Sequence, residues 1–427
     1  MTILKTTLTG AAALTLTAGF AAAECADPVK IGVLHSLSGT MAISETTLKD
    51  TMVMLVDQQN AKGGVLGCEI EAVVVDPASD WPLFAEKARE LLTVSEVDVI
   101  FGSWTSVSRK SALPVLEELN GLMFYPVQYE GEESSKNVFY TGAAPNQQAI
   151  PAVDYFLEEL GVEKFALLGT DYVYPRTTNN ILESYLQDNG IAADDIFVNY
   201  TPFGQSDWAT IVADVVALGE DGKQVGVIST INGDANIGFY KELAAAGISA
   251  DDIPVVAFSV GEEELSGLDT SNLVGHLAAW NYFQSAESDA NTDFIAAWKE
   301  FAGAERVTND PMEAHYIGFN MWVNAVEAAG TTDVDAVRTA MYGQEFPNLT
   351  GGTAVMLPNH HLAKPVLIGE ITAEGQFDII SQTTEVPGDA WTDYLPDSAV
   401  LKSDWKELGC GMYNTATNTC VQLTSNY

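Results

Sequence analysis

The segment VKIGVLHSLSGT, residues 29–40, shows the pattern that decides the fold of this chain. Its first six residues form a short apolar run that is typical of a buried strand. A helical pattern follows from Glu45 to Lys62 and ends at Gly63-Gly64, a pair that commonly stops a helix. Another strand-like run, Glu69 to Val75, comes next. This order of strand, helix and strand predicts a parallel sheet with helices on both faces.

The same alternation continues along most of the chain. It pauses at an expected loop over residues 125–145 and then restarts, so two α/β lobes are predicted, each a doubly wound parallel sheet. No flexible linker separates the two runs, which indicates several short crossings between the lobes. The remaining expected strands are 98–101, 122–124, 164–168, 196–200, 225–229, 255–258, 273–279, 353–357, 365–371 and 376–380.

The charge of the chain excludes some classes of partner. The 427 residues include 59 acidic and 19 basic side chains, which leaves a formal net charge of −40. Nucleic acid is excluded because phosphate binding needs clustered Lys and Arg. The same acid excess argues against docking on an anionic membrane surface. Hydrophobic residues make up 47% of the chain, which is enough for large cores and argues against disorder.

Residues 1–23 have the features of a cleaved secretory signal peptide. Lys5 supplies the positive charge, residues 8–20 a weakly apolar run, and residues 21–23 the small side chains of a cleavage site. We therefore expect cleavage before Glu24 and export of the mature chain.

Four cysteines remain after the expected cleavage: Cys25, Cys68, Cys410 and Cys420. An oxidising compartment favours two disulfides, and three pairings are possible. Cys410 and Cys420 would close a short C-terminal loop. Cys25 and Cys68 each precede an expected strand, so they would share one end of the sheet if those strands are parallel neighbours.

Catalytic and metal-binding motifs are absent from the sequence. It contains no GxxxxGK[ST], GxGxxG, GxSxG, HExxH or CxxC pattern. We therefore expect no metal, no cofactor and no enzymatic activity. A secreted amide or urea hydrolase is the enzyme alternative, and it would need a nucleophile with a base, or a metal centre.

Loops after the expected strands of both lobes are rich in hydroxyl, amide and aromatic side chains. The carboxyl ends of parallel strands form the usual ligand crevice of such sheets. Hydroxyls and amides supply neutral hydrogen bonds, and Trp and Tyr supply flat apolar walls. A single Ser or Thr at such a place is more often a helix cap, but the clustering in both lobes predicts a crevice. The loops are 35–40, 102–106, 125–131, 169–176, 231–234 and 280–283.

Longer motifs carry a resemblance to a known family. They are HSLSGTMAISE (35–45), GSWTSVSRK (102–110), FYPVQYEGEESS (124–135), YTGAAPNQQAIPAVDY (140–155), GTDYVYPRT (169–177), INGDAN (231–236), AAWNYFQS (278–285), NDPMEAHYIG (309–318), NHHL (359–362) and IGEI (368–371). On these motifs the chain resembles periplasmic substrate-binding proteins of the type I fold, in the branched-chain amino-acid and amide cluster. Within that cluster it is most similar to the urea receptors of ABC transporters.

The resemblance implies two lobes that are joined by a three-strand hinge and close on a ligand. Lobe one would comprise residues 24–144 and 284–352, and lobe two residues 145–283 and 353–427. By family position, the residues facing the cleft from lobe one would be Trp104, Ser106, Tyr125, Gln128 and Tyr129. Those from lobe two would be Tyr172, Tyr174, Asn232, Asp234, Glu263, Trp280 and Tyr282.

The resemblance also implies a monomeric periplasmic receptor that captures urea and delivers it to an inner-membrane ABC permease. Urea is planar and neutral, with one carbonyl acceptor and four N–H donors. Trp104 and Tyr172 could stack on its plane, and Ser106 could donate a hydrogen bond to its oxygen. Asn232, Asp234 and Glu263 could accept hydrogen bonds from its N–H groups. Short aliphatic amides, and behind them branched-chain amino acids, are the alternative ligands. A cytoplasmic amide-sensing regulator is a further alternative, which the signal peptide argues against.

Overall fold

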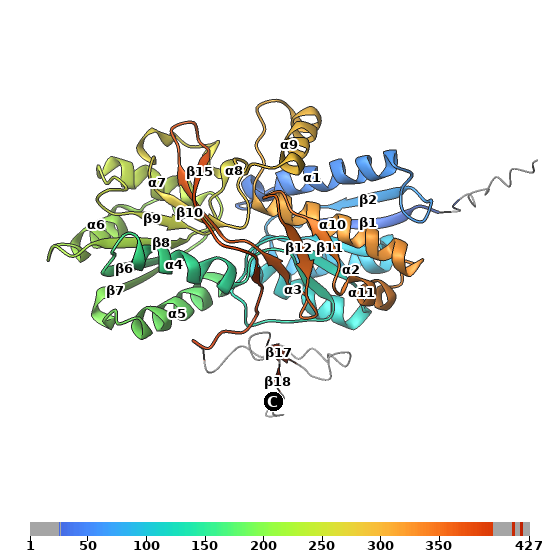
Figure 1. Ribbon diagram of the computed structural model, residues 1–427, viewed down its shortest axis with the longest axis horizontal. Helices are drawn as coiled ribbons and strands as arrows, with labels where there is room; N and C mark the ends of the chain where they lie inside the picture. The colour runs from blue at the N-terminus through green and yellow to red at the C-terminus, as the bar shows by residue number, and fades with distance from the viewer. Residues whose placement is uncertain (1–24, 26, 396–411, 415–418, 422–427) are drawn as a thin grey trace, which may run out of the picture.

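The computed structural model describes residue 25, residues 27–395 and two short strands, 412–414 and 419–421 (Figure 1). The expected signal peptide and Cys410 lie outside the described residues, and for Cys420 only the backbone is described.

Lobe one is built on a five-stranded, fully parallel sheet with the order β2-β1-β3-β4-β5. Its edge strand β5 lies inside the segment 125–145, so the expectation of an uninterrupted loop there was wrong. The three residues of this strand are all fully buried, but they lie in a run that contains Gly, Pro and many polar residues and so has the composition of a loop. The strands are β1 (Val29–Leu34), β2 (Ile70–Val75), β3 (Val99–Gly102), β4 (Met123–Tyr125) and β5 (Val138–Tyr140).

Helices from two separate parts of the chain cover this sheet. Hydroxyl and amide side chains cap several of them: the Thr105 side chain accepts from the Ser108 N–H, and Asn309 accepts from the Met312 N–H. The helices are α1 (Ala42–Ala61), α2 (Trp81–Glu90, continued by a π-helical turn, Leu91–Ser95), α3 (Ser106–Leu119), α9 (Asp289–Ala302), α10 (Asp310–Ala329) and α11 (Val334–Met341).

Lobe two contains a seven-stranded sheet with the order β15-β14-β10-β9-β8-β6-β7. Five strands are parallel, and two later strands pair antiparallel at one edge. Neighbouring residues of β6 point to opposite faces: Phe165 and Leu167 enter one core, whereas Ala166 and Leu168 enter the other. The strands are β6 (Lys164–Thr170), β7 (Ile196–Thr201), β8 (Val225–Thr230), β9 (Val255–Ala257), β10 (Leu277–Trp280), β14 (Leu367–Ile371) and β15 (Phe377–Gln382).

The helices of lobe two lie on both faces of its sheet (Figure 1). They are α4 (Ala149–Glu158), α5 (Val173–Asp188), α6 (Ala209–Leu218), α7 (Ala235–Ala245) and the single turn α8 (Glu262–Leu265). Short 3-10 turns occur at Pro145–Gln147, Ala193–Asp195 and Thr270–Asn272. The mixed α/β fold with two parallel sheets is therefore confirmed.

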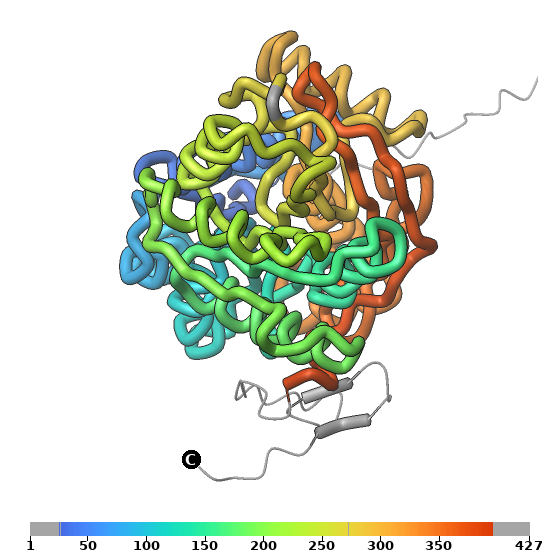
Figure 2. The backbone as a smooth tube through the Cα atoms, turned by 90° about the vertical axis from the view of Figure 1, so that its left-hand side faces the viewer, coloured from blue at the N-terminus to red at the C-terminus, as the bar shows by residue number. Residues whose placement is uncertain are grey.

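Strands near the C-terminus connect the lobes, and in Figure 2 they run along one edge of the molecule. A small antiparallel sheet has the order β11-β12-β13-β16, and β13 leads directly to β14 of the large sheet. The core of lobe one includes Ala354, Met356 and Leu362, which lie beyond the boundary expected at residue 352. The lobe boundaries stay a prediction. The strands are β11 (Glu345–Pro347), β12 (Thr353–Met356), β13 (Leu362–Lys364), β16 (Val386–Pro387), β17 (Met412–Asn414) and β18 (Thr419–Val421).

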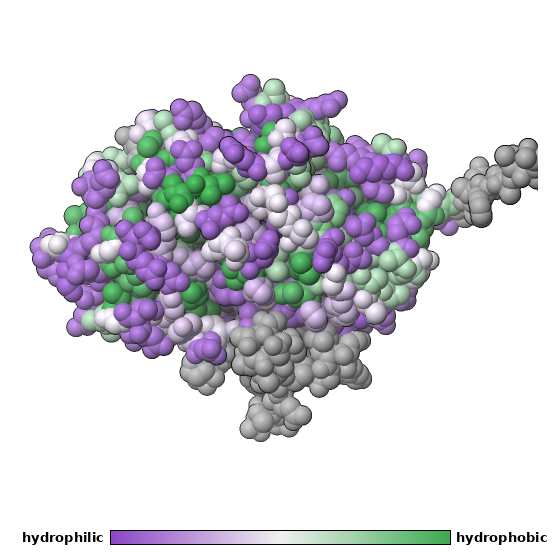
Figure 3. Space-filling view, in the orientation of Figure 1, coloured by the Kyte–Doolittle hydropathy of each residue, from purple (hydrophilic) through white to green (hydrophobic). Residues whose placement is uncertain are grey.

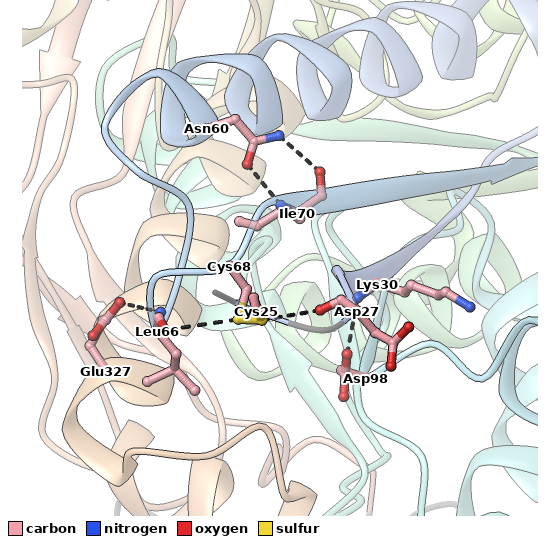
Figure 4. Close-up of a disulfide and its surroundings, with 9 residues drawn as sticks. All are labelled: Cys25, Asp27, Lys30, Asn60, Leu66, Cys68, Ile70, Asp98 and Glu327. Atoms are coloured by element: carbon pink, nitrogen blue, oxygen red, sulfur yellow. Dashed lines mark hydrogen bonds between the residues drawn. A yellow bond between two sulfur atoms is a disulfide. The ribbon is translucent and has the colours of Figure 1, made fainter. Parts of the chain in front are cut away.

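A disulfide joins Cys25 to Cys68, with 5.2 Å between their Cα atoms (Figure 4). Because β1 and β2 are parallel neighbours, the segments that precede them lie at the same end of the sheet. The Cys25–Cys68 bond is thus present, whereas the expected bond between Cys410 and Cys420 lies outside the described residues. The bond ties the N-terminal segment to the loop before β2, where the Leu66 N–H also donates to Glu327 of α10.

Both lobes expose a mostly hydrophilic surface on the face shown in Figure 3, with small apolar patches. In the described parts of the chain, no helix combines the length and the apolar character needed to cross a bilayer.

Candidate functional site

The two lobes touch directly through the loops at the carboxyl ends of their strands. The Trp104 indole N–H, after β3, donates to Asn232 Oδ1, after β8, at 3.2 Å. The Gln128 amide, after β4, donates to the Ser259 hydroxyl, after β9, at 2.7 Å. The lobes are therefore closed on one another, and these two contacts across the predicted crevice are neutral hydrogen bonds.

On the lobe-one side, the start of α3 positions three of the expected residues. Thr105 caps the helix, so Trp104 lies before the cap and Ser106 opens the first turn. The Tyr125 hydroxyl donates to the Trp104 carbonyl, and the Ser106 hydroxyl donates to Glu130. Burial raises the pKa of Tyr125, so its hydroxyl remains a donor.

A charged cluster lies behind these side chains and is neutralised internally. Arg109 pairs with Glu133 at 2.6 Å, and Lys110 approaches Glu133 at 2.5 Å and Glu130 at 3.4 Å. Burial alone would raise the pKa of Glu133, but the two cations lower it to about 2. The Arg109 guanidinium also lies 4.4 Å from the centre of the Tyr125 ring.

On the lobe-two side, the start of α5 supplies two buried tyrosines, Tyr172 at the N-cap and Tyr174 in the first turn. The rings of Tyr172 and Tyr174 are 6.1 Å apart, and Tyr172 also lies 5.0 Å from Phe203. Burial raises the pKa of both hydroxyls. The Tyr174 hydroxyl lies next to Gln128 and Ser259, the pair that joins the lobes.

Two acidic residues expected in the cleft lie away from its centre. Asp234 is exposed at the start of α7. Glu263 is partly exposed and pairs with Arg306 at 3.6 Å. Its neighbour Glu264 instead reaches across the interface, where it accepts a hydrogen bond from the Ser44 hydroxyl of α1 at 2.6 Å.

The polar groups of three expected aromatic residues form hydrogen bonds within a single lobe instead of across the interface. The Trp280 indole donates to the Val260 carbonyl at 2.8 Å inside the core of lobe two. The Tyr282 hydroxyl donates to Asn291 Oδ1 at 2.7 Å, within the core of lobe one. The Tyr129 hydroxyl donates to a backbone carbonyl at 3.1 Å. The structure therefore groups Trp104, Ser106, Tyr125, Gln128, Tyr172, Tyr174 and Asn232 at the interface, apart from these other five residues.

A cavity of about 370 Å³ lies between the lobes, and none of the twelve expected residues lines it. It contains a fully buried carboxylate, Glu45, on the first turn of α1. Sequence reasoning did not single out this residue, although it ends the motif 35–45. The lining residues are Thr40, Met41, Glu45, Ser79, Trp81, Phe84 and Ser108 from lobe one and Asp171, Pro202 and Phe203 from lobe two.

Buried acids also gather where the chain crosses between the lobes. Burial raises the pKa of Glu262 to about 8 and that of Glu264 to about 7. Glu262 accepts from the backbone N–H of Gln284 at 2.7 Å. Within the described ranges, no group of three His, Cys, Asp or Glu side chains is placed to hold a metal ion.

Comparison with known proteins places this geometry in a family. The sequence pattern of a family described as a periplasmic binding protein domain matches residues 29–397. A limonene hydroxylase from Geobacillus stearothermophilus is 31% identical over 134 residues, which are 31% of this chain and 24% of that protein. Leu/Ile/Val-binding protein homolog 7 from Brucella melitensis is 24% identical over 347 residues, which cover 75% of this chain and 82% of that protein.

Solved structures with a similar fold include two solute-binding proteins. One is an ABC-transporter solute-binding protein from R. palustris in complex with 4-hydroxybenzoate, with a TM-score of 0.72 and 19% identity. The match covers 84% of this chain and 98% of that one. The other is the leucine-binding protein LivK from Thermotoga maritima, with a TM-score of 0.72, 17% identity and coverage of 83% and 99%.

Proposed function

The chain belongs to the periplasmic binding protein family, and we propose that it captures urea between its lobes and delivers it to an inner-membrane ABC permease. Proteins of this family bind small ligands and work with ABC permeases, and membership implies export to the periplasm. The Brucella relative and the R. palustris and Thermotoga structures are named as binding proteins rather than enzymes. In such a receptor the ligand favours the closed arrangement of the lobes, and the permease recognises that arrangement.

The observation that carries the urea proposal is the chemistry of the interface. Trp104 donates to Asn232, and Gln128 donates to Ser259, through neutral hydrogen bonds that cross between the lobes. The nearby charges of Arg109 and Glu133 are paired with each other. A neutral solute that is rich in hydrogen-bonding groups suits these two contacts, because neither offers a counter-charge to a charged ligand that has lost its hydration.

The size and shape of the groups also support a small planar solute. Trp104 of lobe one and Tyr172 of lobe two are both buried, and their aromatic side chains have flat faces. Urea carries hydrogen-bonding groups on every edge of its plane. An analogue that leaves a buried polar group of the protein unpaired loses about 1 to 3 kcal/mol of binding free energy. N-methylated ureas are therefore expected to bind more weakly than urea.

Branched-chain amino acids are the second candidate, because the Brucella relative is named as a Leu/Ile/Val-binding homolog and the Thermotoga structure as a leucine-binding protein. Short aliphatic amides are a third ligand class with the same neutral chemistry as urea. The complex with 4-hydroxybenzoate adds aromatic acids to the panel of ligands to be tested.

Calorimetric titration of the mature protein with urea, acetamide, leucine and 4-hydroxybenzoate tests the proposal. The protein is first unfolded and refolded to remove any ligand that it carried through purification. The expected result is tight binding of urea, weak binding of acetamide, and no binding of leucine or 4-hydroxybenzoate. Preference for leucine or 4-hydroxybenzoate would refute the urea proposal and leave the transport role in place.

A further inference from the structure

Glu45 is a carboxylate that is fully buried between the lobes but uses only one of its two oxygens. Its Oε2 accepts from the backbone N–H of Ser36 at 2.8 Å and from His35 Nδ1 at 3.2 Å. Its Oε1 has no hydrogen-bond partner among the described residues. A buried acceptor without a donor is unfavourable, so a ligand N–H group that reaches this oxygen as the lobes close would stabilise it.

The carboxylate is held in place from the far side of lobe one. His35 Nε2 lies 2.8 Å from Nε2 of His315, which is buried on α10. Burial lowers the pKa of His315 well below its ordinary value, so this ring is neutral and acts as a fixed hydrogen-bond partner. The chain of contacts from α10 through His35 fixes which oxygen of Glu45 remains available.

The cavity that Glu45 lines has the polarity of a site for an N–H donor. No Lys, Arg or His is among the described residues that line it, and its second acid, Asp171, is already paired with Arg176 at 2.6 Å. Flat walls come from opposite lobes, where the rings of Trp81 and Phe203 lie 5.7 Å apart. A small planar solute with N–H groups suits these walls and this acceptor.

We propose that Glu45 is a specificity-determining residue whose free carboxylate oxygen accepts an N–H group of the ligand held in this cavity. The inference rests on the proposed function for the identity of that ligand as urea. It assigns the contact to α1 and to the lobe-one end of the cavity, which none of the residues expected from the sequence lines. The cavity is bounded by both lobes, so the contact forms in the closed arrangement.

Replacing Glu45 by Gln reverses the polarity of this contact. The N–H groups of Ser36 and His35 hold the position of Oε2, so the single oxygen of the Gln side chain must occupy it. The NH₂ group of Gln then takes the place of Oε1 and presents donors to the N–H groups of the ligand. We expect Glu45→Gln to bind urea at least tenfold more weakly than the native protein, since hydrogen bonds to charged groups are the stronger class.

The experiment is calorimetric titration of native protein, Glu45→Gln and a matched control, Glu117→Gln, with urea and with leucine. Glu117 lies on α3, accepts a hydrogen bond from the Ser135 hydroxyl at 2.8 Å and does not line the cavity. Its substitution therefore removes the same charge at a different place. Melting curves of all three proteins verify folding. If Glu45→Gln does not fold, Glu45→Ala and Trp81→Leu test the same cavity.

The outcomes separate this inference from the urea proposal. A tenfold loss of urea affinity in Glu45→Gln alone supports the inference, whereas urea affinity within twofold of the native value overturns it. Native protein that binds leucine and not urea refutes the urea proposal. In that case a loss of leucine affinity in Glu45→Gln supports Glu45 as an N–H acceptor, and unchanged leucine affinity overturns it.

Discussion

The hydrogen bond between Trp104 and Asn232 joins the lobes, and Trp104→Phe removes it while keeping an aromatic ring. The two residues are 128 positions apart in the sequence and their polar atoms are 3.2 Å apart. Asn232 is held by its own lobe, because its backbone N–H donates to Thr170 and its amide donates to the Thr230 carbonyl. Its Oδ1 therefore stays in place when the indole is lost, buried and without a donor.

The expected magnitude follows from that orphaned oxygen. A buried acceptor without a partner costs about 1 to 3 kcal/mol, which corresponds to a loss of affinity of about 5-fold to about 150-fold. The cost applies to the closed form alone, because Asn232 meets water when the lobes separate. Trp104→Ala also removes the buried indole, which is 2% exposed, so it is expected to weaken binding by more than tenfold.

Urea titration of refolded native protein and Trp104→Phe measures this effect, and Trp208→Phe is the matched control. The Trp208 indole donates to the Gln205 carbonyl at 3.2 Å, the same distance, but both residues belong to lobe two. We expect Trp208→Phe to lower the melting temperature and to leave urea affinity within about twofold. Equal affinities for the native protein and Trp104→Phe, or equal losses in both variants, would refute the reasoning.

Two further predictions concern stability. Replacing Cys25 and Cys68 by Ala opens a link between residues 43 positions apart, so the free energy of unfolding should fall by about 2 to 4 kcal/mol in urea-free denaturation by guanidinium; an unchanged midpoint would contradict this. Burial raises the pKa of Glu262 from 4.5 to about 8, so the folded protein holds a proton that the unfolded chain releases. The free energy of unfolding should therefore fall as pH rises from about 4.5 to about 8, and Glu262→Gln should flatten this slope, which unfolding curves at pH 5 and pH 8 would show.

Much of the fold could be predicted because burial leaves local periods in the sequence. Val29–Leu34 has the bounds that were expected, since this run of six residues is long enough to show a strand pattern. The short strand β5 was missed because it lies within residues 125–145, a run with the Gly, Pro and polar composition of a loop. The antiparallel pairing of β14 with β10 was also not anticipated, because strand direction depends on the connection and not on composition.

Some residues of the candidate site could likewise be predicted from the sequence, and others could not. Residues in loops after strands, such as Trp104, Gln128 and Tyr172, could be singled out because parallel strands bring such loops to one edge of the sheet. Glu45 could not be singled out in this way. In an acid-rich chain, the sequence does not distinguish a helical carboxylate that is buried from one that is solvated.

The sequence by itself determined the alternation of strands and helices and the two sheets, because each depends on local patterns. The nearness of Cys25 to Cys68 followed only once the structure made β1 and β2 parallel neighbours. Only the tertiary structure decided which loops meet. His35 contacts His315 across 280 positions, and Trp104 contacts Asn232 across the two lobes. Contacts of this kind depend on how whole lobes pack and close, and no local pattern of residues records that geometry.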